Sequence, residues 1–147
     1  MKTLMHFSRL APVILALTLC VLPLTAGEER PWMATISGDE SGVPLTGHAS
    51  HLGDCLLDGY GVVFIEPGLF AGPGTLIAAN GDEVHLSSIV FYFPVTGPET
   101  DIPFSGTITV DGGTGRFEGA TGSAGFNGFQ DYPGGPLAFT WLGTISY

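Results

Sequence analysis

Positive charge is almost absent from this sequence. Lys2 and Arg9 lie near the N-terminus, and only Arg30 and Arg116 follow them. All 14 acidic residues lie beyond residue 26, so two arginines stand against 14 acids and residues 27–147 carry a net charge of −12. Proteins bind nucleic acids and anionic membranes through lysine and arginine side chains. The composition therefore argues against a nucleic acid or an anionic membrane surface as the partner.

Cysteine is nearly absent as well, because Cys20 and Cys55 are the two in the chain. Cys20 lies in the N-terminal segment, so Cys55 is alone in the remainder and cannot form an internal disulfide there. It is either buried and unreactive or pairs between chains, and we expect burial because a free cysteine behaves as a small apolar residue. Packing must then hold the fold together, and a chain of this length can bury a sufficient core.

The long apolar run of the chain lies at the N-terminus. Residues 10–24 are almost wholly apolar, Lys2 and Arg9 precede them, and the small residue Ala26 follows. This order of positive head, apolar middle and small-residue end is typical of a secretory signal peptide. We therefore predict a signal peptide over 1–26, a single domain over 27–147, and a secreted or periplasmic location. A retained membrane anchor is the alternative, although a spanning helix needs roughly 20 apolar residues.

Long helical stretches are missing beyond residue 26, because glycine and proline interrupt the chain at short intervals. Short apolar runs that alternate with polar residues between turn signals predict strands instead. The predicted strands are residues 32–37, 45–52, 56–65, 74–79, 83–93, 104–110, 116–126 and 137–147. We expect an all-β fold, a closed antiparallel β-barrel of about eight strands, since closure removes exposed sheet edges. A β-sandwich is the structural alternative.

Some of these strands carry clear local signals. Asn80-Gly81 between apolar runs predicts a hairpin turn, because both turn positions favour positive φ. Apolar residues alternate with polar ones in 104–110 and 137–147, which predicts one face toward the core. Residues 89–93 are apolar on both faces, so we expect an oligomer interface or folded-over loops to cover the outer face.

A glycine-rich turn is the most specific motif of the chain. It reads Gly112-Gly113-Thr114-Gly115-Arg116-Phe117-Glu118-Gly119-Ala120-Thr121-Gly122. Its glycines admit left-handed backbone conformations, and Phe117 is placed to anchor the next strand in the core. A phosphate-binding loop is not indicated, because the turn lies between two predicted strands rather than before a helix.

This motif resembles the glycine-turn hairpin of the allene oxide cyclase and dirigent-protein barrels. Two further blocks, within residues 47–53 and 78–82, resemble small exported bacterial proteins with the same barrel. The resemblance implies a barrel with an apolar lumen and, in the cyclases, conversion of a small molecule by a few polar groups without a cofactor. Dirigent proteins use acidic and basic lumen residues, a pattern that two arginines hardly supply. The residues expected to contact a ligand are His51, His85, Tyr92, Phe117 and Trp141.

A group of residue types that bind metals lies in one segment, residues 47–55. His48, His51, Asp54 and Cys55 are all types that coordinate zinc. On a regular strand His48 would share a face with Asp54, and His51 with Cys55, so a single four-ligand site is not predicted. His85 either pairs with a nearby acid as a base or is an ordinary exposed strand residue. We expect no metal and no other cofactor.

Three functions fit this sequence. The first is binding of a small apolar ligand in the barrel, and the second is cofactor-free cyclase or isomerase activity in the same lumen. The third is self-association as a homo-oligomer through residues 89–93. Ionisable side chains in the lumen would favour the enzyme, and a purely apolar lumen would favour the binding protein.

Overall fold

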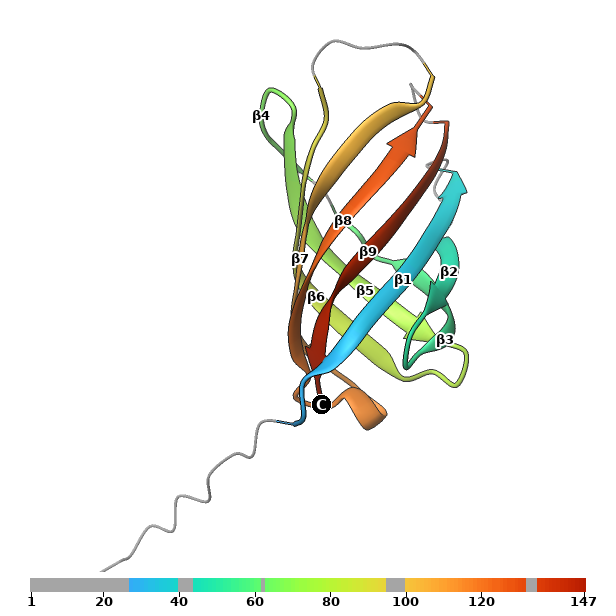
Figure 1. The fold of residues 1–147 in the computed structure, drawn as a ribbon, viewed down its shortest axis with the longest axis vertical. Coiled ribbons are helices and arrows are strands. Elements are labelled where there is room, and N and C mark those ends of the chain that lie inside the picture. The colour runs from blue at the N-terminus through green and yellow to red at the C-terminus, as the bar shows by residue number, and fades with distance from the viewer. Residues whose placement is uncertain (1–26, 40–43, 62, 95–99, 132–134) are drawn as a thin grey trace, which may run out of the picture.

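The computed structural model describes residues 27–39, 44–61, 63–94, 100–131 and 135–147, and the predicted signal peptide lies outside these ranges. The described chain is built almost entirely of antiparallel strands with short turns (Figure 1). The strands are β1 (Arg30–Asp39), β2 (Leu45–Ala49), β3 (Gly53–Asp58), β4 (Val63–Glu66), β5 (Leu69–Ala78), β6 (Glu83–Tyr92), β7 (Ile102–Gly113), β8 (Thr121–Gln130) and β9 (Pro136–Ser146). A short 3₁₀ turn, η1 (Gly115–Phe117), lies between β7 and β8.

The strands form one closed ring, which confirms the predicted antiparallel barrel. Their order is β3-β2-β1-β9-β8-β7-β6-β5, and β3 pairs with β5 to close the ring. β4 stays outside the ring and pairs with the first part of β5, where Val63 lies opposite Ala71. The later part of β5 pairs with β3, where Thr75 lies opposite Asp58. Thus β5 serves two partners in succession, and β4 extends the sheet beyond the barrel wall (Figure 1).

Turns interrupt three of the predicted strands, and the strand predicted over 74–79 begins five residues earlier, at Leu69. The single strand predicted over 56–65 is wrong, because β3 ends at Asp58 and Gly59 follows with φ of 63°. The strand predicted over 45–52 ends at Ala49, since His51 adopts φ of 71° in the turn that follows. The strand predicted over 116–126 begins later, because η1 precedes β8. In each case a positive φ or a tight turn interrupts an otherwise extended apolar run.

Alternation of side chains fills the barrel interior, as predicted for 104–110 and 137–147. Along β9, Leu137, Phe139, Trp141 and Ile145 are buried, whereas Leu142 is 66% exposed on the outer face. The rings of Trp141 and Trp32 of β1 lie 5.0 Å apart. The middle of the barrel is therefore a packed core rather than an open channel.

Glycines at inward positions let the strands approach one another closely. A Cβ atom at Gly106 of β7 would lie 2.6 Å from the ring of Phe126 and 2.7 Å from the Cα atom of Phe91. A Cβ atom at Gly128 of β8 would lie 2.5 Å from the carbonyl oxygen of Ala138. Only glycine leaves room for these contacts, so the residue type at these positions sets the narrow bore of the barrel.

The two ends of the barrel differ. η1 and the β5–β6 turn lie at the same end as the C-terminus (Figure 1, bottom). Phe117 of η1 is fully buried there, and its ring centroid lies 4.8 Å from that of Tyr147. The turn motif thus closes this end of the barrel with an aromatic side chain.

Within the described ranges, no helix has the length and apolar character needed to cross a membrane.

Candidate ligand-binding site

An apolar cleft of about 50 Å³ lies at the end of the barrel opposite η1. Its lining residues come from six strands and from the segments that follow β3 and β6. They are Leu45, Leu57, Tyr60, Ile89, Phe91, Phe93, Phe104, Phe126, Gln130, Leu137 and Phe139. The interior is therefore filled near η1 and retains a small free space at the opposite end.

Aromatic rings form most of the wall of this cleft. The ring of Phe104 lies 5.1 Å from that of Phe93, and Phe126 and Phe139 lie at 6.0 Å and 5.9 Å from Phe104. Several of these pairs are tilted or edge-to-face, which are favourable geometries for aromatic contact. Such a wall offers flat apolar surfaces and positive ring edges to a bound molecule.

The aromatic contacts continue from the cleft to the outside of the barrel. Phe91 stacks on Phe70 of β5 with ring centroids 5.3 Å apart and an interplanar angle of 11°. Phe70 in turn contacts Phe64 of β4 at 5.8 Å, and Phe64 is 62% exposed. An apolar surface thus extends from solvent at β4 to the cleft.

Gln130 is the polar exception within the cleft. It is the last residue of β8 and follows Ala124, Phe126 and Gly128 on the inward face of that strand. Gln130 is 6% exposed, and it is the one polar or charged residue among the described residues that is classed as buried. No hydrogen bond joins its side-chain amide to another described residue. The cleft therefore contains one amide that is free to bond a guest.

Charged side chains are absent from this lining within the described part of the chain. Gln130 and the hydroxyl group of Tyr60 are its polar side-chain groups, and neither is a strong acid or base at neutral pH. The described lining can bind and orient an apolar molecule, and among its residues there is no carboxylate or imidazole for proton transfer.

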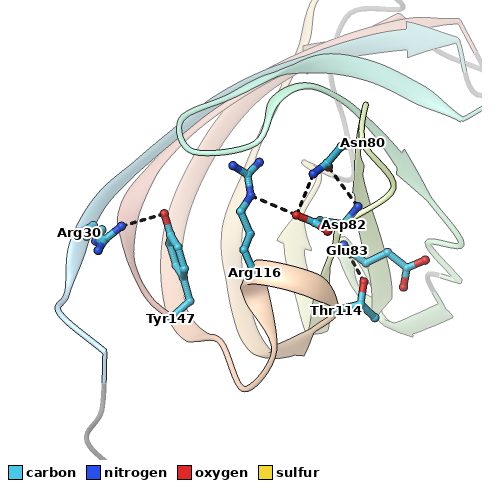
Figure 2. A network of polar contacts seen from close by, with 7 residues as sticks. All are labelled: Arg30, Asn80, Asp82, Glu83, Thr114, Arg116 and Tyr147. Carbon is cyan, nitrogen blue, oxygen red and sulfur yellow. Dashed lines mark hydrogen bonds and ion pairs between the residues drawn. The ribbon is translucent and has the colours of Figure 1, made fainter.

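The closed end holds a polar network around η1, drawn in Figure 2. Arg116 Nε lies 3.3 Å from Asp82 Oδ2, and the side-chain amide of Asn80 donates to the same oxygen at 2.9 Å. The backbone N–H of Glu83 donates to Thr114 Oγ1 at 3.0 Å. These contacts tie the β5–β6 turn to the glycine-rich turn, so the network stabilises the aromatic closure of the barrel.

Arg30, the other arginine of residues 27–147, contacts Tyr147 at the same end of the barrel. Its guanidinium group donates to the hydroxyl oxygen of Tyr147 at 3.1 Å, and its Cζ lies 4.8 Å from the centre of that ring (Figure 2). Tyr147 also packs against Phe117. Both arginines thus support the closed end, away from the cleft.

The four metal-ligand types of residues 47–55 are separated in the structure. His48 Nδ1 and Asp54 Oδ1 lie 3.0 Å apart on the exposed face of the β2–β3 hairpin. His51 lies in the turn, where its Nε2 donates to the carbonyl oxygen of Pro31 at 2.8 Å. Cys55 is buried on the inward face. Within the described ranges, no group of three or more His, Cys, Asp or Glu side chains is arranged to hold a metal ion.

Cys55 is the thiol of the described chain, and it is buried as expected. Burial, with a smaller effect from the negative charge of Asp54, raises the pKa of the Cys55 thiol from 9.0 to about 11. The thiolate is the reactive form of cysteine, so this side chain is a poor nucleophile at neutral pH.

The five residues predicted to contact a ligand do not meet in one place. His51 and Phe117 both approach Tyr147 at the closed end, with ring centroids 5.9 Å and 4.8 Å from it. His85 and Tyr92 face outward on β6, where His85 Nε2 lies 3.0 Å from Glu83 Oε2 and Tyr92 is 53% exposed. Trp141 lies inside the barrel, and its ring contacts that of Phe139 in the cleft wall at 6.0 Å.

Sequence reasoning missed Gln130 as a site residue. Its signal was present, because Gln130 occupies the inward register of a strand whose preceding inward positions are small or aromatic. A polar residue in that register is expected to be buried, and buried polar groups normally have partners. Tyr60 was missed because the prediction placed it within a strand over 56–65, whereas it lies in the irregular segment after β3, which ends at Asp58.

Comparisons of the chain with protein-family models, with curated proteins and with solved structures found no match. The resemblance to the allene oxide cyclase and dirigent-protein barrels therefore stays a prediction, and the case for a function rests on the geometry of the cleft.

Proposed function

We propose that this protein is exported and that its barrel binds a small apolar molecule in the aromatic cleft. The observation that carries the proposal is the cleft itself, an apolar space at one end of a barrel whose other end is packed. Barrels of eight strands are wide enough either to be filled by side chains or to hold one small ligand. In this barrel, side chains fill the end near η1, and a small free space remains at the opposite end.

The size of the cleft sets the expected affinity. A space of about 50 Å³ is smaller than the roughly 150 Å³ of a cavity that encloses benzene, so it takes a short chain or part of one ring, with the rest of the ligand at the open mouth of the cleft. Small ligands gain at most about 1.5 kcal/mol per non-hydrogen atom, and typically a fraction of that. For a ligand of one ring, a total of about 4–6 kcal/mol corresponds to a Kd between roughly 0.05 and 1 mM.

The proposal is tested by titrating the protein into 4-fluorotoluene and observing the ligand by ¹⁹F NMR. We expect saturable binding in the range given above. Leu137→Trp fills the cleft from β9 and is expected to abolish binding. Leu142→Trp, on the same strand with its side chain in solvent, is the matched control and is expected to bind as the unmodified protein does.

Two outcomes would contradict the proposal. One is the absence of saturable binding by the unmodified protein. The other is unchanged binding by Leu137→Trp, which would place the ligand elsewhere. Near-UV circular dichroism of both variants establishes that they retain the barrel, so that a loss of binding reports on the cleft.

The two alternative functions have less support. A cyclase or isomerase requires groups that transfer protons or stabilise charge, and the described lining offers only an amide and a phenol. Self-association through residues 89–93 requires an exposed apolar face on β6. Ile89, Phe91 and Phe93 line the cleft instead, so the outer face of this segment consists of the half-buried Val90 and the exposed Tyr92.

A further inference from the structure

We infer that the ligand is electrically neutral and carries a hydroxyl, carbonyl or amide group that hydrogen-bonds the side chain of Gln130. This inference rests on the proposed binding function and specifies the chemical class of the ligand. It starts from the contrast between Gln130 and the apolar side chains around it. Those apolar side chains provide contact area for a ligand, whereas a hydrogen bond to the amide would fix the orientation of the ligand.

The position of Gln130 makes its amide available from inside the barrel. The residue pairs with Leu137 of β9 and Ile102 of β7, and its side chain lies on the inward side of β8. Its relative exposure is 6%, and no hydrogen bond joins its amide to another described residue. The amide atoms keep contact with solvent, since the buried unpaired side-chain atoms of the described residues are the indole nitrogens of Trp32 and Trp141. The amide carries two N–H donors and one carbonyl acceptor, so it can bond either a ligand oxygen or a ligand hydroxyl.

Burial explains why such a group selects its ligand. In the free protein the amide meets water, because its atoms are not among the buried side-chain atoms without a partner. A guest that fills the cleft displaces this water, and a guest that bonds the amide recovers the lost interaction. A guest without a polar group leaves the amide unpaired. Sites with a buried hydrogen-bonding group therefore discriminate strongly against analogues that lack the complementary group.

The charges around the cleft exclude ionised ligands. No basic residue lines the cleft among the described residues, and Arg30 and Arg116 are engaged at the other end of the barrel. Asp101 and Asp131 lie beside Gln130 on the outer side of the mouth, where they oppose an incoming anion. An ammonium ion would find no carboxylate within the cleft. Either ion would lose its hydration without a counter-charge.

The test uses four probes of one shape, observed by ¹⁹F NMR at pH 7. They are 4-fluorotoluene, 4-fluorobenzyl alcohol, 4-fluorobenzoate and 4-fluorobenzylammonium. Each is titrated against the unmodified protein and against Gln130→Leu, which replaces the amide with an apolar group. Gln130→Met, an unbranched side chain of similar length, is measured in parallel and serves as the variant if Gln130→Leu does not fold.

The decisive quantity is the ratio of the Kd of the alcohol to the Kd of 4-fluorotoluene. Comparing this ratio between the unmodified protein and a variant cancels the difference in hydration between the two probes. We expect it to rise about 10-fold from the unmodified protein to Gln130→Leu, because the variant loses the bond to the hydroxyl. The benzoate and the ammonium probe are expected to bind the unmodified protein at least about 10-fold more weakly than the alcohol does.

The outcomes separate this inference from the proposed function. If neither 4-fluorotoluene nor 4-fluorobenzyl alcohol binds, the binding function itself is overturned. If they bind but the ratio is unchanged in both Gln130 variants, the binding function stands and the role of Gln130 is overturned. If either charged probe binds as tightly as the alcohol, the neutrality of the ligand is overturned.

Discussion

Replacement of Gly128 by alanine tests whether the inward glycines determine the packing of the barrel. A Cβ atom at this position would lie 2.5 Å from the carbonyl oxygen of Ala138 and 2.5 Å from Phe139 Cβ. The clash is partly with backbone, so β8 and β9 must separate to relieve it. Overpacking of this kind costs about 1–3 kcal/mol of the free energy of unfolding.

Gly125→Ala is the matched control, three positions earlier on the same strand. Gly125 is exposed, and the nearest atom to its added Cβ is the carbonyl oxygen of Gly106 at 4.0 Å. Alanine fits there and restricts the unfolded chain, which stabilises by about 0.4–1 kcal/mol. The two variants remove the same kind of residue but are expected to change stability in opposite directions.

Equilibrium unfolding in urea measures this difference. We expect Gly128→Ala to be less stable than Gly125→Ala by about 2–4 kcal/mol, with similar slopes against urea concentration. The reasoning is refuted if both variants unfold at the same urea concentration, or if Gly125→Ala is the less stable of the two. Because Gly128 lies beside Phe104 and Phe139 of the cleft wall, the destabilised variant is also expected to bind 4-fluorotoluene more weakly.

Three further predictions concern other parts of the barrel. The pKa of Cys55 is higher in the folded protein, about 11, than the ordinary 9.0. The protonated thiol therefore stabilises the fold fully below pH 9, and this stabilisation is lost as the pH rises through about 11. Relative to Cys55→Ala, the unmodified protein should lose up to about 3 kcal/mol of unfolding free energy over that pH range, measured in urea at each pH. Phe117→Ala should lower the free energy of unfolding by about 3–5 kcal/mol, because the buried ring closes the barrel end. Arg116→Gln removes only a partly exposed ion pair and should lower it by at most about 1 kcal/mol. Equal losses in the two variants would contradict the role of Phe117 in closing the barrel. Phe64→Lys on exposed β4 should reduce concentration-dependent light scattering and change stability by no more than about 0.5 kcal/mol, and unchanged scattering would rule out β4 as an association edge.

The fold class could be predicted because the relevant signals are local. Asn80-Gly81 predicted a hairpin, and β5 and β6 form one, although Gly81 adopts a positive φ of 86° and Asn80 does not. The alternation in 104–110 and 137–147 predicted inward faces, and the large apolar residues of those faces are buried. Each signal depends on a turn conformation or a period of two, which a few neighbouring residues determine.

The cleft could not be predicted in the same way, because its walls come from strands far apart in the sequence. Leu45 and Phe139 both line it, and only the curvature and stagger of the closed sheet bring them together. Phe117 and Trp141 were rightly expected in apolar surroundings, but their distance from the free space depends on how far each end is filled. His51 left its predicted strand because a positive φ turned the chain at that point.

The pairing of the first and last strands has a consequence for the order of folding. Each residue of β1 from Arg30 to Asp39 has a partner on β9 between Pro136 and Ile145, more than 95 residues later in the sequence. Until β9 is in place, the ring is open, and both β1 and β8 present unpaired backbone edges to other chains. Contacts of such long range slow folding, and they form only after β9 has been synthesised. We therefore expect the seam between β1 and β9 to be the slow step, and incomplete chains to aggregate through it.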